Sequence, residues 1–308
     1  MKRERCTGAV VKTITPYDTE GKIDLQAFRR YIGYVKAEGA ETILVPSEIG
    51  DLDLLSFEER QALVRAAAEE AGDQALIAAQ VTACEISPED QTKAYLALGA
   101  DAVCLRMRFT SAEEYEAAAD AVIGAGAQHV ILTDYGPGGF DMNTGTKRAA
   151  GIPADEILKL FETRKEVKGV IIAVPLNETG SKCSLLAEKT GHQLNIIADT
   201  ATDQIPEQID RGAEGFTTGL FVRVFNRICE LFKKDREEGR KLFFSFLRVI
   251  VWTKQYVDRE PYLYQLYLKN AGIIPVISYR TERYIDEYME RYGAEMEELA
   301  RETEKRCA

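Results

Sequence analysis

The stretch Gly8-Ala9-Val10-Val11-Lys12-Thr13-Ile14-Thr15-Pro16-Tyr17 reads as a short β-strand, rich in β-branched residues and closed by a proline. Lys12 interrupts the apolar run. Because side chains alternate between the two faces of a strand, Lys12 shares its face with Val10 and Ile14. If that face points into a packed interior, the ammonium must be paired or used, since an isolated buried charge is costly. On an exposed strand, or near a rim, the same lysine would be solvated.

A short apolar run followed by a helical segment recurs along the chain. Eight runs are expected to form strands: residues 10–15, 42–46, 75–81, 102–107, 129–133, 170–175, 195–199 and 215–220. Strands that alternate with helices are typical of parallel β-α units. Eight such units form a closed (β/α)8 barrel, so we predict the α/β TIM-barrel fold. A doubly wound open sheet is the alternative, but no glycine-rich nucleotide or phosphate fingerprint follows any of the runs.

Capping residues mark the ends of the expected helices. Ser56 and Ser111 each precede a glutamate by three residues, which fits the capping box, and Ser87 precedes a proline at a first helical position. Glycine before a strand suits the C-terminal cap of the preceding helix. Four Gly-Ala pairs lie at such places: Gly39-Ala40, Gly99-Ala100, Gly126-Ala127 and Gly212-Ala213.

From about Phe221 the pattern changes to helices alone. Helices are expected over residues 225–234, 237–257, 262–271 and 281–305. We therefore divide the chain into a barrel, residues 1–222, and a C-terminal helical extension, residues 223–308, that packs on the barrel. No low-complexity linker separates the two, so we do not expect the extension to be a free module.

Composition limits the classes of protein that the chain can represent. Of its 308 residues 45% are hydrophobic, which is ample for a large core, and the net charge of −11 argues against nucleic acid or an anionic membrane as partner. The six cysteines include no CxxC pair, which is typical of reduced cytosolic thiols. No apolar signal segment follows Met1, and the most apolar run, residues 243–252, is too short for a bilayer. We expect a cytoplasmic protein that acts on a small molecule.

In a (β/α)8 barrel the functional site lies at the carboxyl ends of the strands and in the loops that follow them. The polar residues expected there are Lys12, Thr15, Ser47, Glu48, Arg106, Arg108, Thr133, Asp134, Tyr135, Asp199, Asp203, Thr217 and Thr218. The two histidines lie elsewhere and no histidine or cysteine cluster occurs, so we expect no zinc site and no other cofactor. Carboxylate-bound Mg²⁺ through Glu48, Asp134 or Asp199 is an alternative.

Several motifs are shared with a known family. Thr15-Pro16-Tyr17, followed by Gly21-Lys22-Ile23-Asp24, forms one motif, and Ser47-Glu48-Ile49-Gly50-Asp51 forms a second. Glu260-Pro261 and Arg280 add landmarks near the C-terminus. Together they resemble the dihydrodipicolinate synthase / N-acetylneuraminate lyase family of class I aldolases, over nearly the whole chain. The resemblance implies a barrel enzyme that assembles as a homo-oligomer, either a dimer or a tetramer.

The functional positions of that family have changed in this chain. The resemblance places Ile171 where the family carries its Schiff-base lysine, on the sixth strand. Two threonines that grip the substrate carboxylate in the family correspond to Glu48 and Ile49. An ionised Glu48 would repel that carboxylate, which argues against a conventional pyruvate-dependent aldolase.

The fourth and fifth strands also depart from the family pattern. The family tyrosine corresponds to Thr133, and Tyr135, two residues later on the same face, is expected to take over. Arg106 and Arg108 stand where the family has aromatic residues. The loop after the fifth strand, residues 136–150, is longer than in the family, and its Gly136-Pro137-Gly138-Gly139 segment is not a phosphate-binding motif.

The replacement of the family's functional residues makes Lys12 a stronger candidate for the functional amine. An ungapped alignment from Gly8 to Pro16 places it on a small residue that borders the substrate pocket in the family. The first strand would then supply the amine that the sixth strand no longer carries. A desolvated lysine is a nucleophile toward carbonyls. We hypothesise that Lys12 is the functional amine, either as Schiff-base former or as a cation for an anionic substrate; a structural ion pair with Glu48 or Asp199 is the alternative.

The other candidates receive supporting roles. Glu48 is a candidate general base, or else it only neutralises Lys12. Tyr135 or Asp134 is a candidate for proton transfer, and Arg106 or Arg108 for clamping a carboxylate or phosphate. The remaining residues expected to contact substrate are Thr15, Ser47, Ile49, Thr133, Ile171, Asp199 and Thr217.

Three functions are compatible with this site. The first is a lyase, synthase or hydro-lyase of altered chemistry that acts on a small 2-oxo acid or a sugar-acid-like metabolite. The second is a catalytically inactive barrel that binds a small ligand or serves as an assembly subunit, because fold does not fix function. The third is a metal-assisted lyase. Replacement of polar residues by other polar residues, with a lysine added, favours the first.

Overall fold

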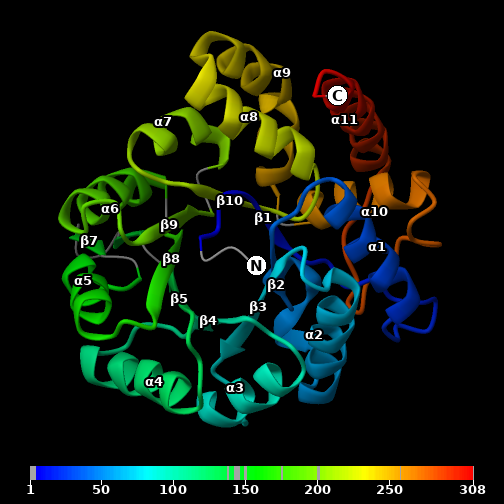
Figure 1. Cartoon of the computed structure of the whole chain (residues 1–308). Helices are drawn as coiled ribbons and strands as arrows, with labels where there is room; N and C mark the ends of the chain where they lie inside the picture. Colours follow the sequence, from blue (N-terminus) through cyan, green and yellow to red (C-terminus); the bar gives the residue numbers. More distant parts are fainter. Residues whose placement is uncertain are drawn as a thin grey trace. The chain divides into compact units, whose positions relative to one another are not determined.

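The computed structural model describes residues 5–136, 139–141, 146–148, 151–174, 176–199, 202–256 and 258–307. Eight parallel strands close into a barrel in the order β1-β10-β9-β8-β5-β4-β3-β2 (Figure 1). Once the separate two-stranded sheet β6-β7 is set aside, neighbours in this order are consecutive along the chain, except that the first strand, β1, and the last, β10, are neighbours where the barrel closes. The predicted (β/α)8 fold is confirmed, and a doubly wound sheet is wrong because an open sheet has two free edges.

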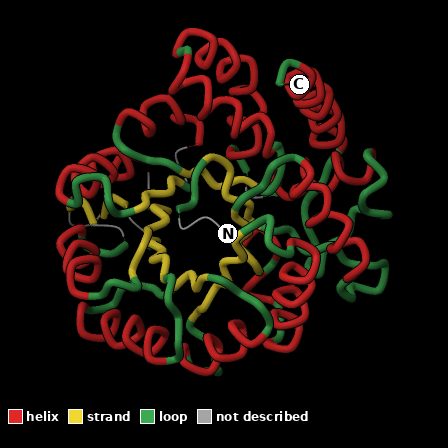
Figure 2. The backbone as a smooth tube through the Cα atoms, viewed as in Figure 1, coloured by secondary structure: helices red, strands yellow, loops and turns green. Residues whose placement is uncertain are grey.

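Strands and helices alternate along the chain (Figure 2). The barrel strands are β1 Gly8–Lys12, β2 Thr42–Val45, β3 Leu76–Thr82, β4 Ala102–Arg106, β5 Val130–Tyr135, β8 Val167–Ala173, β9 Asn195–Ala198 and β10 Gly215–Thr218. The helices are α1 Leu25–Ala37, α2 Phe57–Ala71, α3 Pro88–Ala97, α4 Ala112–Gly124, α5 Ala154–Thr163, α6 Leu176–Lys189, α7 Ile205–Asp210, α8 Val222–Lys234, α9 Arg236–Lys254, α10 Arg259–Asn270 and α11 Glu287–Lys305.

The capping signals of the sequence act as expected. Ser56 and Glu59 form a reciprocal capping box at the start of α2, and the Ser111 hydroxyl accepts a hydrogen bond from a backbone N–H in the first turn of α4. Ser87 caps α3 with a proline at its first position. After α1 and α3 the backbone turns at Gly39 and Gly99, with φ of 93° and 96°, which a side chain would strain.

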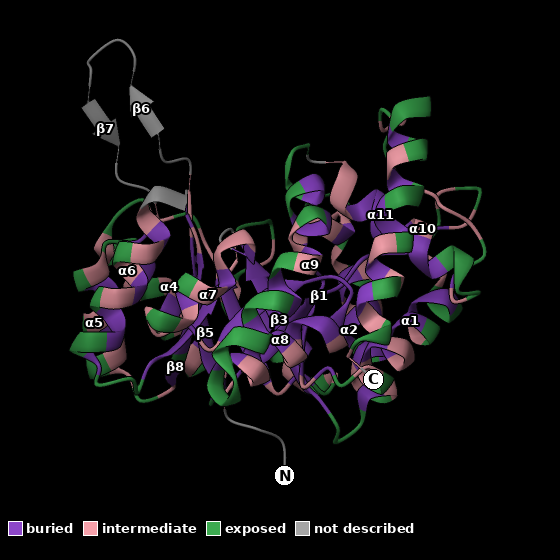
Figure 3. Ribbon diagram, turned by 90° about the horizontal axis from the view of Figure 1, so that it is seen from above, coloured by how far each residue is buried: buried purple, intermediate pink, exposed green. Residues whose placement is uncertain are grey.

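One compact unit comprises residues 1–7 and 76–217. Its strands β3, β4, β5, β8, β9 and β10 pair in parallel in that order, with a register irregularity at Val130/Ile131. All seven residues of β3 are buried, which is typical of a parallel sheet covered on both faces, and Figure 3 draws this strand in the buried colour.

The second unit comprises residues 8–75 and 218–308, and contains β1, β2 and the helices of the extension. β1 pairs with β2 so that Lys12 lies opposite Leu44. The Asn226 side chain of α8 accepts a hydrogen bond from the Ala9 N–H at 2.8 Å and donates one to the Gly39 carbonyl at 3.0 Å. Helix α8 is thereby fastened to both ends of the β1-α1 segment.

Some expected boundaries are wrong. The helix expected over 281–305 begins at Glu287, because the Asp286 carboxylate caps it by accepting a bond from the Met289 N–H at 2.8 Å. Helix α8 begins at Val222 rather than 225, directly after Phe221, whose ring packs against Phe246 at 5.3 Å. Of the predicted helix 237–257, α9 accounts for the part up to Lys254, and residue 257 lies outside the described residues.

Part of the expected 136–150 loop is a hairpin. Strand β6, Gly139–Asp141, pairs antiparallel with β7, Thr146–Arg148. Residues 137–138, 142–145 and 149–150 lie outside the described residues. None of the helices in the described part of the chain is both long and apolar enough to span a membrane.

Candidate functional site

Lys12 is the last residue of β1, and its whole residue is only 6% exposed. Its ammonium donates to Glu48 Oε1, with an Nζ–Oε1 distance of 2.9 Å. The side chains are 8% and 29% exposed respectively, so water reaches the pair from the glutamate side. The structure therefore joins Lys12 to Glu48, the first of the two partners expected from the sequence, and satisfies the buried charge.

Glu48 is held by a tight turn after β2. It begins a 3-10 turn, Glu48–Gly50, in which the Ser47 hydroxyl donates to the Thr13 carbonyl at 2.9 Å. The Thr15 hydroxyl donates to the Gly50 carbonyl at 2.6 Å. A Cβ at Gly50 would lie 2.5 Å from the Thr13 carbonyl oxygen, so only glycine lets the turn approach β1 this closely. Ser47 and Thr15 are thus engaged in positioning Glu48 beside Lys12.

Ile49 faces a buried phenol that sequence reasoning missed. A Cβ at Gly219 would lie 2.7 Å from the Ile49 Cδ1 and 2.6 Å from the Tyr264 ring, so these side chains meet at that glycine. The Tyr264 hydroxyl donates to Glu260 at 2.9 Å, and burial raises the pKa of Tyr264 well above its ordinary value. The landmark Glu260-Pro261 was the only sequence signal for this contact.

Two arginines of the C-terminal segment fasten the same loop region. Arg283 pairs with Asp51 at 2.7 Å and with Asp258 at 2.6 Å. Arg280 pairs with Glu59 at 2.6 Å, next to the start of α2. Asp51 directly follows the turn that carries Glu48, so the extension helps to fix that turn.

In the unit of residues 76–217, Arg106, Thr133 and Tyr135 lie near the ends of two neighbouring strands, β4 and β5. The Arg106 guanidinium lies 4.4 Å from the Tyr135 ring centroid, in a cation–π contact between the ends of β4 and β5. Thr133 lies 3.0 Å from the Cys104 sulfur and is in register with Ile171 of β8. Alternation puts Thr133 and Tyr135 on the same face, as expected.

Asp199 and Thr217 lie at the ends of β9 and β10. The Thr217 hydroxyl donates to the Asp199 carboxylate. Ile171 is 2% exposed, and its register partner on β9 is Ile197. The expected residues of these strands are therefore brought together within this unit.

Asp134 lies on the opposite face of β5 from Thr133 and Tyr135. Its carboxylate is fully buried, pairs with Lys182 of α6 at 2.7 Å and accepts a bond from the Ile152 N–H at 2.6 Å. Burial raises the pKa of Asp134 despite the neighbouring ammonium. A Cβ at Gly151 would lie 1.9 Å from its Oδ1. Asp134 thus ties β5 to α6 and to the segment before α5, and Lys182 is a partner that the sequence did not reveal.

One other candidate, Arg108, lies apart from these residues. Strand β4 ends at Arg106, so Arg108 lies beyond the strand and is exposed. Among the described residues, no three His, Cys, Asp or Glu side chains are grouped so that they could hold a metal ion.

Comparison with known proteins supports the sequence resemblance. Residues 5–133 match the dihydrodipicolinate synthetase family. A 4-hydroxy-tetrahydrodipicolinate synthase of Chlorobaculum parvum is 30% identical over 79 residues, which cover 26% of this chain and 27% of that protein. An uncharacterized DapA-like lyase of Pyrobaculum islandicum is 29% identical over 102 residues, 33% of this chain and 34% of the relative. The matched segments therefore span about a third or less of these curated relatives.

Solved structures extend the likeness to the whole fold. A sialic acid aldolase of Ruminococcus gnavus superposes with a TM-score of 0.81 at 15% identity, covering 99% of this chain and 100% of that one. Dihydrodipicolinate synthase of Rhodopseudomonas palustris gives 0.77 at 17% identity, covering 96% and 98%. Identities this low establish the fold alone. Taken with the match over residues 5–133, they confirm the resemblance: residues 5–133 are similar to the dihydrodipicolinate synthetase family, and nearly the whole chain shares the fold of these solved structures.

Proposed function

We propose that this chain is a lyase, synthase or hydro-lyase that acts on a small 2-oxo acid or a sugar-acid-like metabolite, with Lys12 as its functional amine. The Lys12–Glu48 pair carries the proposal: a buried ammonium at the carboxyl end of a barrel strand, 2.9 Å from a carboxylate that can take its proton. The site end of the fold is where such a pair can act on a bound molecule.

The pair can release and return the Lys12 proton during Schiff-base formation. Glu48 accepts a proton from the Lys12 ammonium, and the free amine adds to the C2 carbonyl of the oxo acid. One N–H proton of the adduct then passes to the former carbonyl oxygen, which becomes a hydroxyl. Glu48 returns the first proton to this hydroxyl, which leaves as water while a C=N bond replaces the C=O bond. The resulting iminium withdraws electrons from C3, so that a C3–H bond or a C3–C4 bond can break with the electron pair flowing toward nitrogen.

Two other residues are candidates for this chemistry by residue type. Tyr135, at the end of β5, offers a hydroxyl for proton transfer, and Arg106, whose guanidinium lies on its ring, offers a cation for a substrate carboxylate. The names of the matched relatives, a synthase and a lyase, are consistent with a carbon–carbon bond reaction. A homo-oligomeric assembly is part of the proposal.

Proton exchange at C3 of pyruvate tests the proposal without knowledge of the second substrate. Loss of the pyruvate methyl signal in D₂O, followed by proton NMR, reports deprotonation at C3. The wild type should exchange these protons faster than buffer, and Lys12→Arg should not, because arginine keeps the charge but cannot lose its proton. Lys182→Arg is the matched control, since it alters the other buried lysine–carboxylate pair, and should retain exchange. Equal exchange by Lys12→Arg and wild type would refute the role of Lys12.

A binding protein without turnover is the second candidate, and one observation favours it. Glu48 already neutralises the Lys12 ammonium, which is what a purely structural or ligand-holding pair would show. This candidate predicts that pyruvate raises the melting temperature of wild type and of Lys12→Arg alike, with no methyl exchange in either. Exchange by the wild type alone would exclude it.

A further inference from the structure

Tyr31 of α1 is a buried phenol beside the backbone of Lys12. The residue is fully buried, and its hydroxyl donates to the Gly219 carbonyl at 2.6 Å. The Lys12 carbonyl oxygen lies 3.4 Å from the same hydroxyl, as a second and longer acceptor. Burial raises the pKa of Tyr31, so the phenol keeps its proton and acts as a neutral donor. One hydroxyl group therefore joins the last residue of β1 to Gly219.

Gly219 also contacts the turn that carries Glu48. A Cβ at Gly219 would lie 2.7 Å from the Ile49 Cδ1, so the Ile49 side chain packs directly against this glycine. Ile49 follows Glu48 in the tight turn after β2. Tyr31 thus connects Gly219 to Lys12, and Ile49 connects the same glycine to the turn. The two partners of the 2.9 Å ion pair therefore share one anchor in the backbone.

The position of the strand end matters because a lysine side chain is itself flexible. Its ammonium sits at the end of a four-carbon stem, so the place of the amine is defined only when the backbone is fixed. In Lys12 the ammonium is held by Glu48 at 2.9 Å, and the backbone carbonyl lies against the Tyr31 hydroxyl. A displacement of about 1 Å in a reacting group can lower a rate about 10²-fold. The anchor of the Lys12 backbone therefore affects any reaction of the amine.

We propose that Tyr31 is a positioning residue for the Lys12 amine: its hydroxyl fixes the end of β1 so that the amine and Glu48 meet in the arrangement that proton transfer requires. The proposal rests on the proposed function of Lys12. Tyr31 acts through the Lys12 backbone rather than through contact with the substrate. Loss of its hydroxyl would take this donor from the Gly219 carbonyl and allow the end of β1 to shift.

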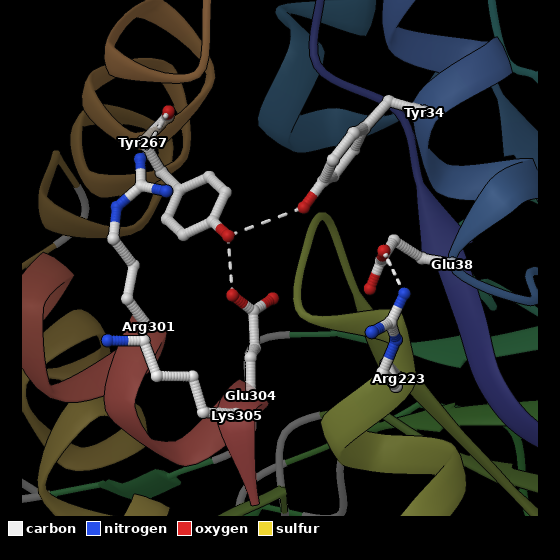
Figure 4. A pocket seen from close by; sticks show the side chains of 7 residues that line it. All are labelled: Tyr34, Glu38, Arg223, Tyr267, Arg301, Glu304 and Lys305. Atoms are coloured by element: carbon white, nitrogen blue, oxygen red, sulfur yellow. Dashed lines mark hydrogen bonds and ion pairs between the residues drawn. The ribbon is translucent and has the colours of Figure 1, made fainter. Parts of the chain in front are cut away.

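Tyr34 offers a matched control one turn further along the same helix. Its hydroxyl donates to the Tyr267 hydroxyl at 3.4 Å, and Tyr267 in turn donates to Glu304 (Figure 4). Tyr31→Phe and Tyr34→Phe each remove one hydroxyl from α1 and keep the aromatic ring. Only Tyr31→Phe removes the donor that lies against the Lys12 backbone. A difference between the two variants therefore reports the position of Lys12 rather than the stability of the helix.

The kinetics of pyruvate methyl exchange in D₂O, normalised to the folded fraction by circular dichroism, compare the two variants. Tyr31→Phe should lower kcat at least about tenfold and leave KM for pyruvate unchanged, because the geometry of proton transfer changes while the groups that bind pyruvate remain. Tyr34→Phe should keep the wild-type kcat and KM. An unchanged kcat in Tyr31→Phe, a change confined to KM, or an equal loss of kcat in both variants would overturn the proposal.

Reductive methylation tests the position of Lys12 without pyruvate. Formaldehyde and dimethylamine–borane methylate lysine amines, and peptide mass spectrometry gives the rate at each residue. Lys12 should react about three- to tenfold faster in Tyr31→Phe than in wild type or Tyr34→Phe, the effect of one lost hydrogen bond, because a displaced amine leaves Glu48. Lys182 serves as the internal reference and should react at the wild-type rate. An unchanged rate at Lys12 would overturn the role of Tyr31, whether or not pyruvate is a substrate, whereas pyruvate exchange that survives in Lys12→Arg would overturn the proposed function instead.

Discussion

Two buried lysine–carboxylate pairs of this protein look alike and differ in surroundings. Lys12 and Glu48 are joined at 2.9 Å and Lys182 and Asp134 at 2.7 Å. Glu48 is 29% exposed, whereas the Asp134 side chain is fully buried and also holds a backbone N–H. A pair that water and small molecules can reach is able to exchange protons. A pair whose carboxylate is fully buried can only hold elements of the fold together. The exposed fraction of the carboxylate, rather than the lysine–carboxylate distance, therefore separates a candidate catalytic pair from a structural one.

The largest expected contrast concerns catalysis by the two carboxylates. Glu48→Gln keeps the shape of the side chain but cannot take a proton, so pyruvate exchange should fall about 10²–10⁴-fold, the usual worth of a general base. Asp134→Asn should exchange at the wild-type rate per folded molecule. The rates come from the NMR assay, normalised to the folded fraction by circular dichroism. Equal loss in both variants would remove the distinction between the pairs.

The loss of stability should be larger for the Asp134 variant than for the Glu48 variant, the reverse of the order expected for catalysis. Asp134→Ala leaves the Lys182 ammonium without its buried partner and should lower the free energy of unfolding by about 3–5 kcal/mol. Glu48→Ala should cost about 1 kcal/mol or less, since water that reaches Glu48 can also solvate the remaining ammonium. Urea unfolding of both variants measures the two values. A larger loss for Glu48→Ala would mean that the Lys12 pair is the structural one.

A glycine lies close to each of the two lysine–carboxylate pairs, so matched glycine-to-alanine variants can compare them further. Gly50→Ala would bring a Cβ within 2.5 Å of the Thr13 carbonyl oxygen, and Gly151→Ala within 1.9 Å of Asp134. Both should destabilise by about 1–3 kcal/mol through crowding. Only Gly50→Ala should also slow pyruvate exchange in the folded fraction, because it moves the turn that carries Glu48. Thermal unfolding and the exchange assay together check this; slowed exchange in Gly151→Ala alone would contradict it.

The smallest effect is a pH dependence of stability. Because burial raises the pKa of Asp134 above its ordinary value of 3.8, the folded chain binds more protons than the unfolded chain between those two values. The contribution of Asp134 to stability is therefore greatest at low pH and declines as pH rises through the raised pKa, by at most about 1.4 kcal/mol per pH unit. The unfolding free energy of wild type minus that of Asp134→Asn, measured from pH 4 upward, should fall. A difference that rises with pH would contradict it.

The barrel was predictable because its cause is local. Each β-α unit carries its own apolar run, cap and turn, as Ser56 and Gly39 illustrate. Eight such units in succession are typical of a closed barrel. The alternation of side chains also placed Lys12 on the face of Val10 and Ile14, where it would need a partner if that face were buried. The same rule, applied to Thr133 and Tyr135, places Asp134 on the other face of the strand. Asp134 was a site candidate only because it is a carboxylate, and the alternation already argued against it.

Long-range contacts were not predictable from a single chain. Lys182 meets Asp134 from a helix 48 residues away, and Arg283 meets Asp51 across 232 residues. Tyr264 reaches Ile49 through packing at Gly219, which no periodicity encodes. Arg108 does not lie on the same strand face as Arg106, because β4 ends at Arg106. The end of a strand depends on its neighbouring strands.

The most direct measurement of the central claim is chemical trapping. The wild type, Lys12→Arg and Lys182→Arg are incubated with pyruvate and sodium borohydride, digested, and searched by peptide mass spectrometry for the reduced lysine adduct. We expect an adduct on Lys12 in wild type and in Lys182→Arg, and none at position 12 in Lys12→Arg. A wild type that exchanges pyruvate protons yet carries no adduct on Lys12, or carries it on Lys182, would contradict it.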